Sequence, residues 1–278
     1  MRSYRQSTYL TGLLIALVCF CLPPAAIWPQ GSSTSDGGPI SINKCWETAS
    51  AAPVDGPIAS DRETIFIPLT SGGIDAVNVR DGRILWSADL GGKLGSKVLV
   101  TDEALYVVSV SSGTAAAGRE SAAVRSISKP TGITNWRKPL AFSAQYFLGS
   151  VPGGIIAAGN SGQIEFFSSG DGSTIWKMSV PGVISAEPFF ANDKMLFGSN
   201  QKAVFVLSAA NGSILSRTPV KHVPTAVTMS SDGEMIVGDE RGNLALYDGN
   251  RNLQWNFKNG ARISYIEHTK HGILAASF

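Results

Sequence analysis

Three histidines and three cysteines are the residues of this 278-residue chain best suited to binding a metal or acting as nucleophiles. His268 and His271 are three residues apart, a spacing that brings two imidazoles to one metal when it falls on a helix. Both histidines lie on a predicted turn between strands, and His222 is far from them in the sequence. We therefore interpret them as solvated loop histidines.

The cysteines predict neither a disulfide nor a metal centre. Cys19 and Cys21 fall in an N-terminal apolar run, so Cys45 is the one thiol in the rest of the chain. One thiol cannot form an internal disulfide or a four-cysteine site, and we expect Cys45 to be a small buried hydrophobic residue. The sequence also lacks the Gly-x-Ser-x-Gly elbow, the P-loop and the Gly-x-Gly-x-x-Gly turn. We predict no catalytic residue, metal or cofactor, and hence no enzyme.

Composition restricts the fold class and the partners. The chain has 30 glycines and is 44% hydrophobic but only 16% charged. This balance suits a turn-rich all-β protein better than a helical one. The formal net charge of +2 is too small to indicate a nucleic-acid partner, and none is expected.

The N-terminus has the pattern of an export signal. Arg2 and Arg5 precede a short apolar run that ends at Pro23, followed by Ala25 and Ala26. This order is typical of a secretory signal peptide, which we assign to residues 1–26. An uncleaved membrane anchor is the alternative, although the run is short for a span of about 20 residues. We expect residues 27–39, rich in Ser and Gly, to be a flexible linker, and the protein to be periplasmic or extracellular.

Tryptophans mark a repeat of roughly 40 residues. Their successive spacings are 40, 50, 40 and 79 residues, and Ser216 occupies the position missing from the last gap. The longer spacing of 50 contains a Ser-, Gly- and Ala-rich insertion at residues 111–121, which is either a recognition arm or neutral. The register residues are Trp46, Trp86, Trp136, Trp176 and Trp255.

Glycine-containing turns separate the predicted strands of each repeat. Asp-Gly and Asn-Gly favour tight hairpins because both central residues adopt positive φ. One alternating strand precedes each turn, another follows it, and two further short strands complete the unit. Four strands per roughly 40 residues predict an all-β fold: a β-propeller of about six four-stranded blades, forming one domain over residues 40–278. The turn glycines are Gly82, Gly132, Gly172 and Gly212.

The two ends of this domain are predicted to meet. Residues 263–266 and 272–276 supply two strands of a sixth unit, whereas residues 40–48 carry Trp46 on the register without a blade of their own. Pairing this segment with the C-terminal strands would close the ring and remove two exposed sheet edges. The last blade would then have three or four strands. An open or truncated array is the alternative.

The repeat resembles the PQQ-like (pyrroloquinoline quinone) propeller repeat of the quinoprotein alcohol dehydrogenase-like superfamily, whose motif runs Ala-x-Asp-x-x-Thr-Gly-Lys-x-x-Trp. Residues 76–86 match its spacing, with Asp81 and Gly82 in the turn and Trp86 at the end. Ser216 replaces the tryptophan in the fourth copy, and Arg251 replaces the glycine in the last. The resemblance implies that each tryptophan packs between adjacent blades and that the glycine lets it approach the backbone.

The same resemblance argues against quinone chemistry. PQQ enzymes of this superfamily usually have eight blades, an Asp base, a calcium ion held by Glu and Asn, and often a disulfide of adjacent cysteines, whereas this chain has fewer repeats and no adjacent cysteines. The chain also resembles, distantly, the propeller lipoprotein of the outer-membrane β-barrel assembly machinery, but lacks a lipidation site. We therefore expect a scaffold that binds another envelope protein. A small PQQ- or ligand-binding enzyme and a carbohydrate-binding or lyase-like propeller are alternatives.

Several cations fall in loops that the propeller topology places at one end. These loops join an outer strand to the next inner strand, or the second strand of a blade to the third. They predict a mildly basic docking face for a protein or an anionic polymer, with ordinary solvated charges as the alternative. The candidate residues are Lys93, Lys202, Lys221, His222, Arg241, Lys258 and Arg262.

Overall fold

The computed structural model describes residues 44–111, 121–141, 143–191, 193–269 and 272–277. The expected signal at 1–26, the linker at 27–39, residues 112–120 of the insertion and His271 lie outside these described residues. All regular elements within the described ranges are strands. None of the described segments forms a helix of the length and hydrophobicity that crossing a bilayer requires.

Blade 3 shows how the sequence forms each unit. Its strands β10 (Tyr146–Val151), β11 (Gly154–Gly159), β12 (Gln163–Ser168) and β13 (Thr174–Ser179) pair antiparallel in chain order. The second strand, β11, is apolar throughout and buried at every residue, because neighbouring blades cover both of its faces. The outer strand β13 is mostly exposed, and its sequence alternates accordingly.

Four further blades share this arrangement, and a hairpin follows them. The inner strand of blade 2 is split into β5 and β6, so its sheet has five strands rather than the predicted four. Blade 1 contains β1 (Ala59–Ser60), β2 (Thr64–Pro68), β3 (Gly73–Asn78) and β4 (Ile84–Asp89). Blade 2 contains β5 (Lys93–Leu94), β6 (Leu99–Val100), β7 (Ala104–Ser111), β8 (Ser121–Ser128) and β9 (Thr134–Leu140). Blade 4 contains β14 (Phe189–Ala191), β15 (Lys194–Ser199), β16 (Ala203–Ser208) and β17 (Ile214–Pro219), blade 5 contains β18 (Pro224–Met229), β19 (Met235–Asp239), β20 (Asn243–Tyr247) and β21 (Leu253–Lys258), and the hairpin contains β22 (Ile263–Thr269) and β23 (Gly272–Ser277).

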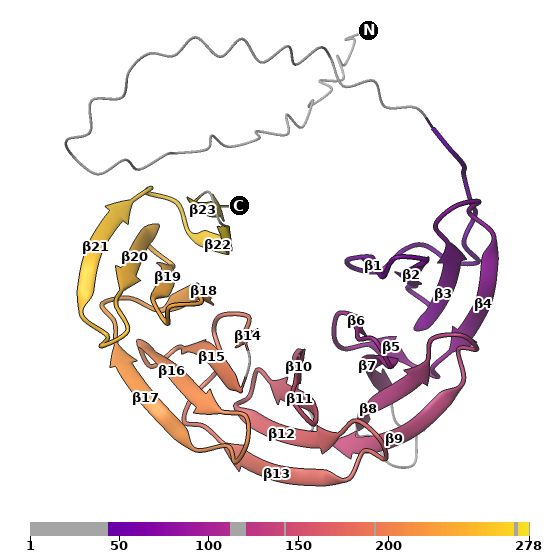
Figure 1. Cartoon of the computed structure of the whole chain (residues 1–278), viewed down its shortest axis with the longest axis horizontal. Coiled ribbons are helices and arrows are strands. Elements are labelled where there is room, and N and C mark those ends of the chain that lie inside the picture. Colours follow the sequence, from indigo (N-terminus) through magenta and orange to yellow (C-terminus); the bar gives the residue numbers. More distant parts are fainter. Residues whose placement is uncertain (1–43, 112–120, 142, 192, 270–271, 278) are drawn as a thin grey trace, which may run out of the picture.

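The blades stand side by side around a central axis, with inner strands toward the centre and outer strands at the rim (Figure 1). Their apolar core lies between blades. Ile156 and Phe166 of blade 3, for example, belong to one buried cluster with Phe197 and Phe205 of blade 4. This arrangement confirms the predicted all-β propeller.

The predicted ring closure is not seen in the described residues. β22 and β23 form a sheet of two strands that does not include residues 44–48, and the arc is open between this hairpin and blade 1 (Figure 1). The described strands therefore make five complete blades and a hairpin, not six closed blades. A repeat identifies each segment's place within a blade, whereas the packing angle at every junction decides whether the ends meet.

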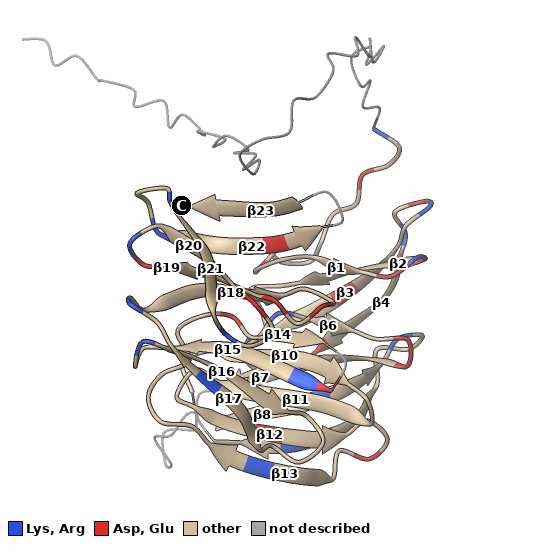
Figure 2. Ribbon diagram, turned by 60° about the vertical axis from the view of Figure 1, so that its left-hand side comes forward, with Lys and Arg blue, Asp and Glu red and all other residues tan. Residues whose placement is uncertain are grey.

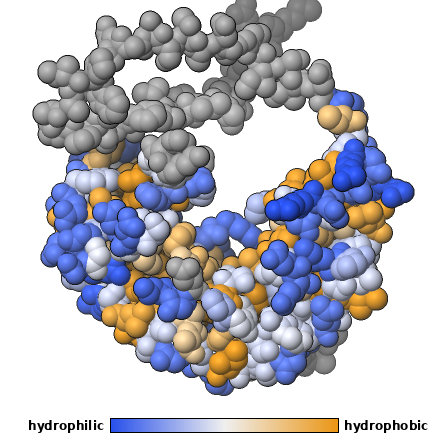
Figure 3. All heavy atoms as spheres, in the orientation of Figure 1, coloured by the Kyte–Doolittle hydropathy of each residue, from blue (hydrophilic) through white to orange (hydrophobic). Residues whose placement is uncertain are grey.

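Apolar side chains are also exposed at the outer rim. They lie near the start of the outer strands, and Figure 3 shows hydrophobic residues at several places around the rim with hydrophilic ones between them. Scattered apolar residues of this kind are normal on protein surfaces. They include Ile84, Leu85, Ile133, Ile175, Ile214, Leu215 and Leu253.

Candidate functional site

Four of the register tryptophans reach across the junction to the following blade. The indole Nε1 of Trp86 in β4 donates a hydrogen bond to the carbonyl oxygen of Lys129, in the β8–β9 turn of blade 2. The partly buried ring also lies 6.0 Å from the ring of Phe66, centroid to centroid. A hydrogen bond of the same kind, from the indole Nε1 to a backbone carbonyl oxygen, joins Trp46 to Val79 at 2.8 Å, Trp86 to Lys129 at 2.7 Å, Trp136 to Ser169 at 3.0 Å and Trp176 to Ala209 at 2.7 Å.

A turn glycine lies under each of these indoles. Gly82 has φ of +71°, which favours glycine, and a Cβ added there would lie 2.5 Å from the ring of Trp46. No real side chain tolerates such an approach, so the glycine admits the indole of the preceding repeat. The corresponding Cβ-to-ring distances are 2.6 Å for Gly132 and Trp86, 2.6 Å for Gly172 and Trp136, and 2.9 Å for Gly212 and Trp176.

The two departures from the repeat motif fall at one junction. Ser216 stands where blade 4 would carry its tryptophan, and Arg251 stands in the facing turn of blade 5, at φ of +70°. Without an indole above it, the turn has room for a side chain, and the Arg251 guanidinium donates to the Gly233 carbonyl. The Ser216 hydroxyl is buried without a hydrogen-bond partner. The motif is therefore lost on both sides of the same contact.

The last register tryptophan, Trp255, lies between blade 5 and the hairpin. It is partly buried against a cluster that includes Ile263 and Ile266 of β22, and Ile273 and Ala275 of β23 pack against the same cluster. Trp255 thus packs toward the element that follows it, as the other register tryptophans do.

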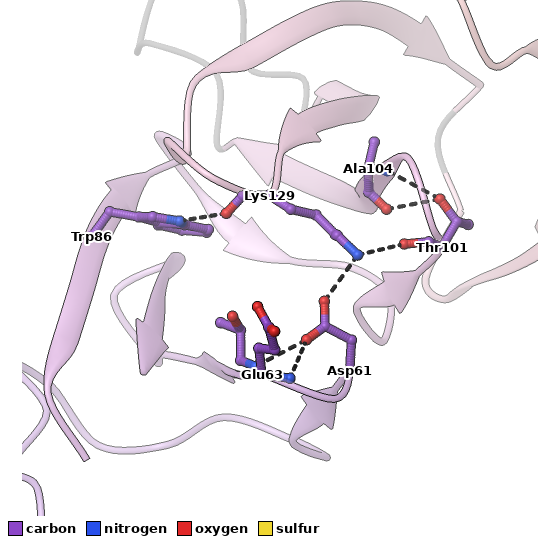
Figure 4. Close-up of polar contacts among 7 residues, drawn as sticks. Asp61, Glu63, Trp86, Thr101, Ala104 and Lys129 are labelled. Carbon is purple, nitrogen blue, oxygen red and sulfur yellow. Dashed lines mark hydrogen bonds and ion pairs between the residues drawn. The ribbon is translucent and has the colours of Figure 1, made fainter. Parts of the chain in front are cut away.

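An ion pair joins blade 1 to blade 2 beside the Trp86 contact (Figure 4). Lys129 Nζ lies 2.9 Å from an Asp61 carboxylate oxygen and also donates to the carbonyl of Thr101. Burial acts to raise the pKa of Asp61, but the Lys129 ammonium and the backbone N–H groups of Glu63 and Thr64 outweigh it, so the pKa is lowered. One lysine therefore contacts both blades, through its carbonyl and its ammonium.

Five of the seven candidate basic-face residues come from neighbouring loops, and a sixth, Lys258, ends strand β21 beside them. Lys202 lies in the β15–β16 turn, and its carbonyl accepts the N–H of Val220, next to Lys221 in the β17–β18 loop. Asn259, next to Lys258, likewise donates to Gly242, next to Arg241. Figure 2 shows these cationic loops beside β18, β19 and β20. The loops place Lys202, Lys221, His222, Arg241 and Arg262 around blades 4 and 5, with Lys258 at the end of β21, whereas Lys93 begins β5 in blade 2.

The acidic residue Asp239 at this face accepts hydrogen bonds within its own turn. Asp239 is buried, and one carboxylate oxygen accepts the N–H groups of Arg241 and Asn243 while the other accepts the Asn243 amide. Glu240 is exposed beside it. Because Asp239 is turned into the protein, the solvent-facing charge of these loops is mainly cationic.

Sequence reasoning missed a cavity of about 490 Å³ on the inner side of the arc. Asp55, Lys97, Tyr146 and Glu187 are among its lining residues. Lys97 Nζ, between β5 and β6, contacts both carboxylate oxygens of Glu187, which precedes blade 4, at 2.7 and 2.6 Å. These two residues are 90 positions apart and both are exposed, so no local pattern pointed to their contact.

Two expectations about the chemically active residues were wrong. Cys45 is exposed rather than buried, because the segment that carries it lies at the rim, and its neighbour Trp46 faces blade 1. His268 lies in β22, paired with Ile273, rather than in a turn. Within the described ranges, no group of three or more His, Cys, Asp or Glu side chains could hold a metal ion.

Comparison with known proteins identifies the repeat. A PQQ-repeat family model, described as outer membrane protein assembly factor BamB, matches residues 40–141 and 120–269. This match confirms the resemblance to the PQQ-like propeller repeat. No curated protein matches the chain.

Two solved structures have a similar fold. BamB from Moraxella catarrhalis is 14% identical, with a TM-score of 0.54 over 84% of this chain and 83% of that one. The WD40 β-propeller domain of Doa1 is 13% identical, with a TM-score of 0.57 over 79% of this chain and 74% of that domain. At these identities the structural similarity shows the propeller fold alone.

Proposed function

Because the chain belongs to the family of outer membrane protein assembly factor BamB, we propose that it is a non-catalytic scaffold of the bacterial cell envelope that binds another envelope protein. The family match carries this proposal, since it spans residues 40–269 and so nearly all of the predicted propeller. The repeated motif residues are used in packing blades together, which leaves the loops as the variable surface for a partner.

The docking face of this scaffold is assigned to the basic loops of blades 4 and 5. Lys202, Lys221 and Arg241 are exposed there, while the Asp239 carboxylate is held by its own turn. A cationic surface attracts an acidic patch of a partner and raises the association rate. An acidic protein surface therefore fits this end of the arc.

Capture from an envelope extract tests the assignment. The tagged chain is compared with the double variant Lys221→Glu/Arg241→Glu and with Arg80→Glu/Arg83→Glu, a matched charge reversal at exposed residues of the β3–β4 turn in blade 1. We expect the first variant to lose the captured partner and the second to retain it. Equal recovery with both variants would remove the basic loops from the docking face.

Export through residues 1–26 is part of the same proposal. The family is named for an outer-membrane assembly factor, and the basic and apolar N-terminal pattern supports passage across the inner membrane. N-terminal sequencing of the protein purified from the envelope should begin after Ala26. A chain that retains residues 1–26 in the membrane fraction would favour the uncleaved anchor.

Ligand binding is the second candidate function, and the inner cavity is the observation that favours it. The cavity combines the Lys97–Glu187 ion pair with the partly apolar walls of three blades, a mixture that small-molecule sites commonly have. Addition of pyrroloquinoline quinone and Ca²⁺ should leave its absorbance unchanged if the chain is a scaffold. A spectral change that the Glu187→Gln variant abolishes would favour the enzyme instead.

A further inference from the structure

Blade 2 carries extra residues in its inner strand, at the gap between β5 and β6. From Leu94 to Leu99 the inner strand takes five steps, whereas the paired residues of β7 are only three steps apart. The surplus forms a β-bulge, a feature that commonly re-aims side chains beside functional sites. The Ser96 hydroxyl accepts the N–H of Val108 there. A side chain thus makes a ladder hydrogen bond that the bulged backbone no longer makes.

Blades 1 and 4 carry the same bulge at the same position. Val54 and Ala59 of blade 1 are also five residues apart, although their partners are three apart. Ile184 and Phe189 repeat this pattern in blade 4. Blade 3 has no such bulge, since every residue of β10 pairs one to one with β11. The bulges comprise residues 55–58, 95–98 and 185–188.

The three bulges converge on the inner cavity of about 490 Å³. Its lining contains residues from each bulge together with Tyr146, Phe147 and Leu148 of β10, and Figure 1 shows the inner strands facing the central opening. Lys97 and Glu187 occupy the third position of their bulges, and their ion pair at 2.6 Å joins blades 2 and 4 in front of blade 3. Because blade 3 packs without a bulge, blade packing does not account for the other three.

The edge of β10 that faces this cavity can pair with another strand. β10 is the terminal strand of its sheet, and the Tyr146 N–H donates to Gly95 of blade 2 rather than to β11. Backbone groups of alternate residues point to the same edge of an antiparallel strand. The N–H and C=O of Leu148, which lines the cavity, therefore also point away from β11. Such an edge is a template for the addition of an extended peptide.

The charges of the cavity favour a basic ligand. Its charged lining residues are Asp55, Lys97 and Glu187, two carboxylates against one ammonium group. Both Glu187 oxygens contact Lys97 Nζ, whereas Asp55 is exposed on the wall that blade 1 forms. An exposed ion pair is weak and exchanges its partners at little cost. A lysine or arginine of a ligand can therefore bind at these carboxylates.

We propose that the cavity binds an extended, basic peptide segment, which adds as a strand to β10 beside Leu148 and directs a lysine or arginine toward Asp55 and Glu187. Alternate side chains of the added strand then face the apolar part of the cavity wall. The origin of this segment in an envelope protein rests on the proposed scaffold function, whereas peptide binding itself does not. This site is separate from the basic loops of blades 4 and 5, which attract an acidic surface.

Selection from random heptapeptides displayed on phage tests the site. The full chain is compared with Asp55→Asn/Glu187→Gln and with the matched control Asp102→Asn/Glu103→Gln, which removes the same charges from the exposed β6–β7 turn. We expect the chain and the control to enrich the same basic peptides. The cavity variant should lose them and favour acidic peptides, because Lys97 is then the remaining charge of the lining. No enrichment, an enriched pool without basic residues, or the same pool from the cavity variant would overturn the proposal.

A synthetic peptide of the most enriched sequence tests strand addition. Its affinity should fall about tenfold with the cavity variant, as expected from the loss of two partly exposed charge contacts. Methylation of single backbone nitrogens should weaken binding at every second position, because alternate N–H groups face β10. Equal effects at all positions would show that the peptide does not pair with β10. Since these experiments use no envelope extract, their failure leaves the basic docking face unaffected, and failure of partner capture leaves this site unaffected.

Discussion

At the scale of single residues, the junctions depend on an indole and a glycine from consecutive blades. Trp86 packs on Gly132 and donates to Lys129. We expect Trp86→Ala to lower the free energy of unfolding by about 3 kcal/mol, at the lower end for buried aromatic residues, because the ring is partly exposed. Denaturant titration measures the change, with Leu85→Ala on the exposed rim as the control. Equal stability of the Trp86 variant and the parent would exclude this packing role.

The altered junction between blades 4 and 5 allows a reciprocal test. Ser216→Trp alone should be destabilising, because the indole would meet the Arg251 side chain in the facing turn. Adding Arg251→Gly should recover part of the loss, since the glycine gives the indole the space that Gly212 gives Trp176. A double-mutant cycle of unfolding free energies measures this coupling. Additive effects of the two substitutions would mean that they do not face each other.

At the scale of elements, the Asp61–Lys129 pair connects two blades and should make their association depend on pH. The lowered pKa of Asp61 means that its contribution is complete above the unfolded-state value of about 4 and is lost as pH falls through the folded pKa. Asp61→Asn should therefore reduce the unfolding free energy by about 1 kcal/mol at pH 7. Below about pH 4 the difference from the parent should shrink. A difference that persists unchanged at pH 2 would contradict the ionic origin.

At the scale of the whole molecule, Lys202, Lys221, Arg241, Lys258 and Arg262 come together around blades 4 and 5 from separate parts of the chain. We expect the affinity for the captured envelope partner to fall between 50 and about 500 mM salt, because the screening length shortens to a few ångströms over this range. The Lys221→Glu/Arg241→Glu variant should show a weaker salt dependence than the unmodified chain. Titration at several ionic strengths measures both slopes. Salt-independent binding by the unmodified chain would place the contact elsewhere.

The repeat made the propeller predictable, because its signals are local. Each turn such as Asp81-Gly82 and each alternating strand depends on residues close in sequence, and recurrence about every 40 residues identified equivalent positions without a structure. Local signals failed at Cys45, whose exposure depends on what lies beyond blade 1, and at His268, where the strand extends past its expected end.

The identity of the strands, their order within a blade and the residues at the junctions could thus be read from the amino-acid order. The opening between the β22–β23 hairpin and blade 1, the inner cavity and the Lys97–Glu187 contact could not. These features depend on the angles accumulated over successive blade junctions, which arise from side-chain packing between residues far apart in the chain. A period along the sequence specifies neighbours within a blade, but only packing in three dimensions decides how the blades turn around the axis.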